Sequence, residues 1–330
     1  MKLLVTGGAG YIGSHTVKAL LAAGHEPVVL DNLSRGHVAA VPAGVAFINK
    51  DIADPNLAEL LREEQIEGIM HFAAHSQVGE SMVNPAIYYE NNVVGSFRLI
   101  EAARQAGVRY FVFSSTAAVY GEPDEVPIKE TADLHPTNVY GRTKLMIEHM
   151  LHDYSSIYGM RYVALRYFNA AGADHSGCIG EDHTPETHLI PLVLQAAQGK
   201  RESITVFGTD YPTADGTCIR DYIHVSDLAS AHVLAMEYLR DGGESQVFNL
   251  GTGNGFSVKE IIDTAKKVTG IDFNVTIGER RAGDPAKLIA SSDKIKDMLG
   301  WKPVASEVEQ VLADAWRWHE AHPNGYDDKD

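Results

Sequence analysis

The stretch Thr6-Gly7-Gly8-Ala9-Gly10-Tyr11-Ile12-Gly13 follows a short apolar run, Leu3-Leu4-Val5, and leads into a helical pattern that stops at Gly24. Its glycines leave a turn with few Cβ atoms, so backbone amides can approach a pyrophosphate at the N-terminus of the following helix. A glycine triplet alone is weak evidence, because ordinary turns also collect glycine. The strand–turn–helix context makes it specific, and we expect a dinucleotide to contact Gly7, Gly10, Tyr11, Ile12 and Gly13.

The first half of the chain alternates short apolar runs with longer helical patterns. Strands are predicted at 3–5, 28–30, 45–48, 68–72, 110–113 and 162–165, and helices at 57–64, 88–106 and 140–158. Apolar runs this short, separated by helices, are typical of a parallel sheet covered on both faces. The sequence therefore predicts an α/β fold with a doubly wound parallel (Rossmann) sheet, in a nucleotide-binding domain of residues 1–172.

After Asn169 the sequence becomes richer in Gly, Asp, His and Pro, with long polar loops. We expect residues 173–330 to form a smaller mixed α/β C-terminal substrate domain over the carboxyl edge of the sheet, where ligands of such sheets bind. Its predicted elements are a helix at 189–198, a strand at 204–207, a helix from an N-cap at Asp227 to Tyr238, and a strand at 247–250. Parts of 221–250 are expected to pack back on the first domain.

Composition narrows the class of protein. The chain has 330 residues, 45% of them apolar, and a net charge of −16. An acidic chain does not attract nucleic acid by its overall field, so none is expected as a partner. Cys178 and Cys218 are the only cysteines and predict neither a disulfide framework nor a metal site. The N-terminal apolar run is too short for a signal peptide, and no stretch is long enough to span a membrane, so we expect a cytoplasmic protein.

Asp31 ends the second predicted strand, about 20 residues beyond the glycine turn. A carboxylate there would bind the ribose hydroxyls of NAD and repel the 2′-phosphate of NADP. The alternative is a turn-initiating Asp31-Asn32 pair, and Arg35 argues for NADP. Asp51, after the third strand, is expected to meet the adenine edge, although a plain loop aspartate fits as well. NAD is the predicted cofactor.

Tyr140 and Lys144 stand at i and i+4, on one helical face. A free tyrosine has a pKa of about 10 and is a poor base, but a nearby ammonium and a positive nicotinamide ring favour the phenolate. The hydroxyl of Thr116, at the end of the fifth strand, is expected to share a proton between Tyr140 and a sugar oxygen, unless this polar strand end is only a cap. The predicted catalytic set is Tyr140, Lys144 and Thr116.

Seven motifs together resemble one family, the extended short-chain dehydrogenase/reductases: TGGAGYIG at 6–13, LDN at 30–32, HFAA at 71–74, SSTAAVYG at 114–121, YGRTK at 140–144, RYFN at 166–169 and RDYIHVSDLA at 220–229. The resemblance runs from Met1 beyond Trp301. LDNLSRG and GTCIRDYIHV point to the branch of UDP-glucose 4-epimerases.

The resemblance implies a tightly held NAD that takes hydride from C4 of a UDP-sugar and returns it to the other face after the 4-keto sugar rotates. It adds cofactor contacts at Asn32, Ile52, Phe72, Ala73, Ala74, Asn92, Ser114 and Tyr167, besides Tyr140 and Lys144. The residues it implies at the UDP-sugar, besides Thr116, are Asn169, His188, Leu189, Thr205, Phe207, Arg220, Arg281, Asp284 and Leu288. It also implies a homodimer through the helices at 88–106 and 140–158, unless their apolar faces pack only on the sheet.

Some of these positions have other readings. Arg220 fits a salt bridge to Asp221 or Asp227, and Phe207 fits core packing. Three positions depart from the family pattern: Ser76 replaces a common Lys, His188 replaces Asn, and Leu288 stands where strictly hexose-specific members carry Tyr. The smaller Leu288 leaves open an epimerase of UDP-N-acetylhexosamines.

Three other classes remain as alternatives. A dehydratase or decarboxylase acting on nucleotide sugars shares the fold, but dehydratases need an acidic pair after the hydroxyl residue, where this chain has Ala117 and Ala118. An alcohol dehydrogenase would release its cofactor in each turnover. A dinucleotide-sensing protein without catalysis would tolerate the loss of Tyr140 or Lys144.

Overall fold

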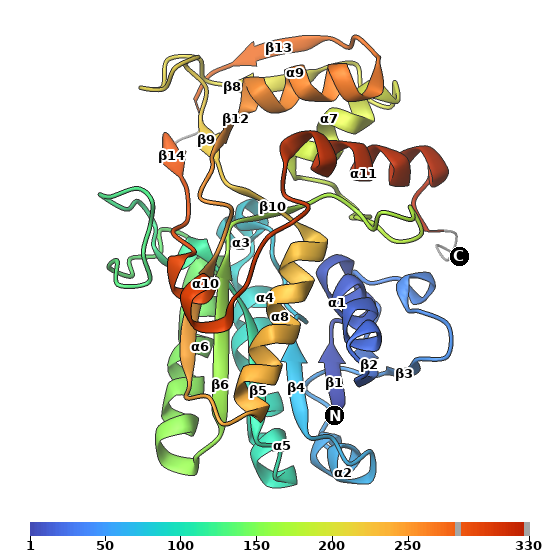
Figure 1. Cartoon of the computed structure of the whole chain (residues 1–330), viewed down its shortest axis with the longest axis vertical. Helices are drawn as coiled ribbons and strands as arrows, with labels where there is room; N and C mark the ends of the chain where they lie inside the picture. Colours follow the sequence, from blue (N-terminus) through green and yellow to red (C-terminus); the bar gives the residue numbers. More distant parts are fainter. Residues whose placement is uncertain (281–284, 327–330) are drawn as a thin grey trace.

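A seven-stranded parallel sheet organises the chain in the computed structural model, which describes residues 1–280 and 285–326. The strand order is β11-β6-β5-β4-β1-β2-β3, and every neighbouring pair is parallel (Figure 1). The strands are β1 Lys2–Thr6, β2 Glu26–Asp31, β3 Ala46–Asn49, β4 Gly68–His71, β5 Tyr110–Thr116, β6 Arg161–Tyr167 and β11 Gln246–Leu250. The predicted doubly wound fold is confirmed.

Helices cover both faces of this sheet. Along β1, Leu3 and Val5 pack into one core cluster with α1 and α8, whereas Leu4 packs into a second cluster with α2, α5 and α6. This division follows from the alternation of side chains along a strand. The helices are α1 Tyr11–Ala22, α2 Leu57–Glu63, α5 Ser96–Ala106, α6 Val139–Tyr158 and α8 Val225–Arg240.

Smaller sheets lie above the carboxyl edge of the large sheet (Figure 1). They pair β7 Asn169–Ala171 with β10 Tyr222–His224, β8 Ile204–Phe207 with β13 Val275–Gly278, and β9 Ile219–Arg220 with both β12 Phe256–Ser257 and β14 Lys287–Leu288. α7 Leu189–Ala197, α9 Val258–Thr269 and α11 Val308–Ala321 share a separate core cluster. β11 is a strand of the large sheet and α8 packs on that sheet. The chain therefore returns to the large sheet after β7–β10 and then ends above it. The division at residue 172 stays a prediction.

The remaining short helices are α3 Val78–Val83, α4 Pro85–Tyr88 and α10 Asp293–Leu299, with 3₁₀ turns at Val38–Ala40 and Ala117–Val119. Among the described helices, none combines the length and apolar character that crossing a membrane requires.

The long helix predicted over 88–106 is confirmed, and its first part is π-helical. α4 ends at Tyr88, a π-helical segment covers Tyr89–Gly95, and α5 begins only at Ser96. Asn92 in the π segment is fully buried, accepts a hydrogen bond from the amide of His75 at 2.9 Å and donates to its carbonyl at 3.0 Å. The wider turn thus presents Asn92 to the segment after β4.

The predicted N-cap at Asp227 is wrong. α8 begins at Val225, and Nδ1 of His224 accepts the capping hydrogen bond from Ser226. The buried carboxylate of Asp227 instead accepts hydrogen bonds from the amides of Val304 and Ala305, at 2.8 and 2.9 Å. Its partners lie more than 70 residues away, so no local pattern reveals them.

His232 of α8 makes the acid stability of the fold testable. Its Nδ1 bonds to the carbonyl of Leu228 at 2.9 Å, and its buried Nε2 has no hydrogen-bond partner among the described residues. Burial lowers its pKa from 6.5 to about 4. Between these values the unfolded chain binds a proton that the folded chain does not, so the free energy of unfolding falls as the pH falls through this window. The slope is up to about 1.4 kcal/mol per pH unit.

We expect His232→Phe, which keeps an aromatic ring against Phe72 and Tyr167, to lose part of this dependence. Urea unfolding at pH 6.5 and pH 4.5 measures this dependence. The free energy of unfolding should fall more in the wild type than in the variant, because the wild type takes up one additional proton when it unfolds. Equal losses in both proteins would contradict the assignment.

Candidate active site

The glycine turn between β1 and α1 is packed so closely that side chains are excluded at two of its positions. A Cβ on Gly7, where φ is +71°, would lie 2.6 Å from the amide nitrogen of Ala73, and one on Gly13 would lie 2.1 Å from the carbonyl oxygen of Gly7. Gly10 precedes α1 in extended conformation and offers no side chain to cap the first-turn amides. The first turn of α1 therefore presents backbone N–H groups, as a pyrophosphate requires.

Asp31 lies at the carboxyl end of β2, beside this turn. Its carboxylate is buried and accepts hydrogen bonds from the amides of Ala9 at 3.0 Å and Leu33 at 2.9 Å. Burial raises its pKa, and the two amides oppose this shift. The hydrogen bond from Leu33, two residues further on, is the one expected of a turn that begins at Asp31. The position of Asp31 at a strand end beside the glycine turn fits a carboxylate that binds ribose, so the placement agrees with both interpretations. Arg35, which argued for NADP, donates to the carbonyl of Thr184 at 2.8 Å and pairs with Glu80 at 3.2 Å.

The other predicted cofactor residues surround the same edge. Asn32 donates to the carboxylate of Asp51 at 2.9 Å, so these two lie together beyond β2 and β3. The amides of Phe72 and Ala73 bond to the carbonyl of Thr6, which brings the segment after β4 against the glycine turn. Ile52 and Ala74 lie in the loops that follow β3 and β4, and Asn92 lies in the π-helical segment. Ser114 of β5 and Tyr167 at the end of β6 hydrogen-bond to each other through their hydroxyls. Tyr11 begins α1 and donates to the carbonyl of Gly172 at 2.6 Å.

Tyr140, Lys144 and Thr116 come together as the sequence predicts. Asn138 caps α6 by accepting from the amide of Gly141 at 2.8 Å, and this fixes where the helix begins. The ammonium of Lys144 donates to the carbonyl of Ser114 at 2.8 Å and lies 5.9 Å from the centre of the Tyr140 ring. The hydroxyl of Thr116 accepts a hydrogen bond from the amide of Ala118 at 3.1 Å and lies close enough to the phenol of Tyr140 to lower its pKa. The three side chains therefore meet where β5 ends beside α6.

Burial acts on both titratable groups of this set. It raises the pKa of Tyr140 to about 12, and the nearby hydroxyl of Thr116 opposes the shift. It lowers the pKa of Lys144 to about 7, while the charge of Glu148 favours its protonated form. A lysine that titrates near neutrality is suited to proton transfer, and a cation bound nearby would make the phenolate of Tyr140 easier to form.

A buried ion pair beneath Lys144 was not predicted. Glu148, one helical turn after Lys144, binds the guanidinium of Arg166 through two hydrogen bonds of 3.0 and 2.6 Å, and both side chains are 5% exposed. Ser115 donates to the same carboxylate at 2.5 Å, and Arg166 donates to the hydroxyl of Tyr120 at 3.0 Å. Two features of the sequence could have indicated this ion pair: Glu148 stands four residues after Lys144, and Arg166 is the arginine of the RYFN motif.

On the substrate side, β9 and β14 place Arg220 and Leu288 at the same register position. Leu288 packs against the apolar cluster formed by Val119, Tyr120 and Ile128, two of which come from the segment after Thr116. Asn169 donates to the carbonyl of Asp221 at 2.9 Å, which joins β7 to this region. The carboxylate of Asp221 accepts hydrogen bonds from the amides of Thr252, Gly253 and Ala290, so it anchors two segments, after β11 and after β14, beside Arg220.

The remaining predicted substrate residues lie further out. Phe207 ends β8 and is 38% exposed, and the hydroxyls of Thr205 and Thr276 bond at 3.0 Å. Leu189 begins α7, and His188 before it turns its ring toward Glu181, with Nδ1 2.7 Å from Oε1. Arg281 and Asp284 lie outside the described residues. Ser76, which replaces the family's lysine, is exposed.

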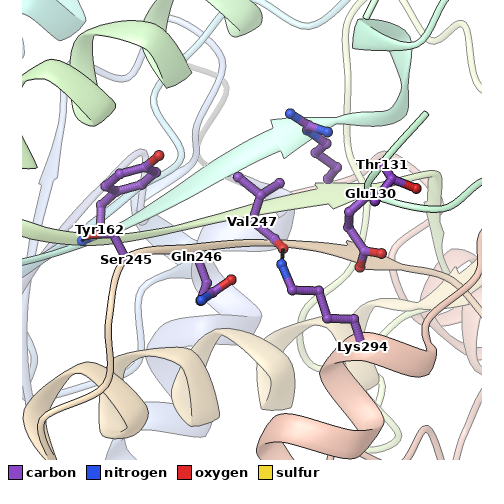
Figure 2. A pocket seen from close by; sticks show the side chains of 8 residues that line it. Glu130, Thr131, Tyr162, Ser245, Gln246, Val247 and Lys294 are labelled. Atoms are coloured by element: carbon purple, nitrogen blue, oxygen red, sulfur yellow. Dashed lines mark hydrogen bonds between the residues drawn. The ribbon is translucent and has the colours of Figure 1, made fainter. Parts of the chain in front are cut away.

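A separate pocket of about 390 Å³ opens beside the edge strand β11 (Figure 2). Lys294 reaches across it to donate to the carbonyl of Val247 at 2.8 Å. None of the predicted site residues lines it; the lining residues are Glu130, Thr131, Tyr162, Arg166, Ser245, Gln246, Val247 and Lys294. It is therefore not the candidate active site.

Residues 3–251 match the model of the NAD dependent epimerase/dehydratase family. The chain belongs to this family. It is 54% identical over 330 residues to the UDP-glucose 4-epimerase of Lacticaseibacillus casei, covering 100% of each chain. The crystal structure of UDP-glucose 4-epimerase from Brucella ovis in complex with NAD superposes with a TM-score of 0.94 at 49% identity, covering 96% of this chain and 97% of that one. The structure of the UDP-Glc/GlcNAc 4-epimerase from Campylobacter jejuni gives 0.86 at 46% identity, covering 97% and 99%.

Membership of this NAD-dependent family agrees with the chemistry of the edge described above. Gly7 and Gly13 leave room that a Cβ would fill, the first turn of α1 offers amides to a pyrophosphate, and Asp31 offers a carboxylate at the adjacent strand end. The residues present therefore fit NAD.

Proposed function

We propose that this enzyme interconverts UDP-galactose and UDP-glucose, as a UDP-glucose 4-epimerase. The observation that carries the proposal is the meeting of Tyr140, Lys144 and Thr116 beside the nucleotide-binding turn, in a chain 54% identical throughout to an enzyme of that name. NAD, when bound, accepts the hydride from C4 of the sugar and gives it back. Its redox state is then restored within each turnover.

Tyr140 is the base in this proposal. Its phenolate takes the proton from the 4-hydroxyl of the sugar as C4 loses hydride, and the resulting phenol returns the proton when the hydride comes back. Thr116, whose hydroxyl lies near that of Tyr140, would bind the sugar oxygen and hold it in line. Lys144, fixed by the carbonyl of Ser114, places positive charge near the ring and favours the phenolate. The uridine diphosphate is assigned to Asn169, Leu189, Thr205, Phe207 and Arg220, together with Arg281 and Asp284.

Incubation of the purified protein with UDP-galactose, without added NAD, tests the proposal. The anomeric proton signals in NMR should show steady conversion to UDP-glucose, because we expect NAD to stay bound during purification. If neither UDP-galactose nor UDP-N-acetylgalactosamine is converted after NAD is added, the proposed activity is wrong.

A second substrate is supported by Leu288. This side chain lies in register with Arg220 and packs against the cluster of Val119, Tyr120 and Ile128, so we infer that its size affects the space around the sugar. The Campylobacter jejuni relative is named for both UDP-Glc and UDP-GlcNAc. We propose that UDP-N-acetylhexosamines are also accepted.

Leu288→Tyr is expected to lower kcat/KM for UDP-N-acetylgalactosamine by about 10-fold or more and to change that for UDP-galactose little, since a steric misfit of this kind costs about 1–3 kcal/mol. Leu288→Met, which keeps a similar volume, is the control and should leave the ratio unchanged. An equal loss on both sugars in the tyrosine variant would contradict the gate.

We also propose that the enzyme acts in the cytoplasm as a homodimer. A chain with only two cysteines, Cys178 and Cys218, lacks the cysteine content of a disulfide-stabilised secreted protein, which suits a reducing compartment. Exposed apolar side chains on α5 and α6 support a helical interface, namely Phe97, Met146, Ile157 and Tyr158.

A further inference from the structure

The segment between β7 and α7 holds two histidines and two glutamates in one cluster, formed by Glu181, His183, Glu186 and His188. One donor atom from each lies within 4.8 Å of all the others. The side chains of Glu181 and Glu186 are 6% and 5% exposed, that of His183 is 22% exposed and that of His188 is 46% exposed. None of the steps proposed for Tyr140, Lys144 and Thr116 uses this cluster.

The separations match those of donor atoms around one metal ion. His183 Nδ1 lies 3.1 Å from Glu181 Oε1 and 3.7 Å from Glu186 Oε2, and His188 Nδ1 lies 2.7 Å from Glu181 Oε1 and 3.1 Å from Glu186 Oε1. Zinc bonds to imidazole nitrogen and carboxylate oxygen at about 2.0–2.2 Å, so ligand atoms of a tetrahedral site lie about 3.4 Å apart. The four imidazole–carboxylate separations fall on both sides of that value.

A second observation argues for a ligand. Nδ1 of His183 is buried and makes no hydrogen bond of regular geometry, although carboxylate oxygens lie close to it. Buried polar atoms normally make hydrogen bonds. A metal ion placed between the four ligand atoms would give this nitrogen the partner that no single N–H···O hydrogen bond supplies. Two carboxylates and two neutral imidazoles would balance a divalent cation.

We propose that Glu181, His183, Glu186 and His188 bind one Zn²⁺ ion. Two imidazole nitrogens with two carboxylate oxygens are ligands that zinc accepts, and they disfavour Mg²⁺ and Ca²⁺, which prefer oxygen alone. A cavity of about 230 Å³ that Glu181, His183 and Glu186 help to line, together with the half-exposed His188, gives the ion access.

The position of the cluster explains what the metal would do. Residues 181–188 cross the opening of the nucleotide site, because Arg35 beyond β2 binds the carbonyl of Thr184 and Gln77 beyond β4 binds that of Pro185, at 2.8 and 3.0 Å. The ring of His183 also meets that of Tyr11 edge-on, with centroids 6.3 Å apart. A metal ion would hold this segment in one conformation against the start of α1 and next to Leu189.

Zinc binding by the metal-free protein, purified without a histidine tag, tests the site by competition with a chromogenic chelator. We expect one Zn²⁺ per chain and a loss of affinity of at least about 100-fold in His183→Gln and in His188→Gln, since even outer-shell changes cost 10–100-fold. His188 is half-exposed, so its variant disturbs folding least. His175→Gln changes an exposed histidine of the same segment, outside the cluster, and should bind zinc normally.

Bound Co²⁺ should give the visible absorption of a tetrahedral site in the wild type and in His175→Gln only. Zinc should likewise raise the Tm of these two proteins and leave that of His188→Gln unchanged. The proposal is overturned if the wild type binds no zinc, or if all four proteins bind it equally. Neither result bears on the epimerase reaction, which uses other residues.

Discussion

Tyr140→Phe is expected to lower turnover of UDP-galactose by about 10²–10⁴-fold, the usual contribution of a general base. The variant removes the one hydroxyl that both meets Thr116 and lies beside Lys144. The ring itself is 9% exposed and stays in place, so the cofactor should remain bound. Initial rates and the absorbance of the bound cofactor after gel filtration measure the two effects.

Tyr154→Phe is the matched control, because Tyr154 lies on the same helix and donates only to Glu101, at 3.0 Å. It should turn over at nearly the wild-type rate. A Tyr140→Phe enzyme as fast as this control would exclude Tyr140 as the base.

Glu148→Ala is expected to lower the free energy of unfolding by about 3–5 kcal/mol, because it leaves the buried guanidinium of Arg166 without its carboxylate. Urea unfolding at neutral pH measures the loss. Lys144 loses a neighbouring negative charge in the same variant, so the pKa of Lys144 should fall further.

Two controls separate burial from pairing. Glu101→Ala breaks the Glu101–Arg104 pair, whose side chains are 28% and 36% exposed, and should cost about 1 kcal/mol or less. Replacing both Glu148 and Arg166 with Met removes the charges together and should cost less than Glu148→Ala alone. Similar losses of unfolding free energy for Glu148→Ala and Glu101→Ala would contradict the claim that burial makes the loss of one partner more costly.

Local patterns predicted the parts of this protein that depend on local spacing. The glycine turn, the strand ends at Asp31 and Thr116, and the i, i+4 pair Tyr140 and Lys144 each follow from a few neighbouring residues, and the structure gathers them at one edge of the sheet. Parallel strands make this possible, because all their carboxyl ends meet at the same edge.

Long-range hydrogen bonds account for what local patterns did not predict. Asn92 opens a helix into a π segment because it binds His75, and Asp227 serves residues 304 and 305 instead of capping its own helix. The contact of His188 with Glu181, within one loop, was likewise not predicted, and its place beside the substrate stays a prediction. Partners of this kind are set by tertiary packing, which periodicity does not report.

Reversible transfer of one hydride at C4 is the central claim, and an isotope label tests it most directly. UDP-galactose carrying deuterium at C4 should give UDP-glucose that keeps the deuterium at C4 in ordinary water, because the hydride leaves and returns within the closed site. Mass spectrometry and NMR of the product show where the label lies. Replacement of the deuterium by protium from water would mean that C4 is deprotonated or its hydroxyl eliminated, and would contradict hydride transfer with Tyr140 as the base.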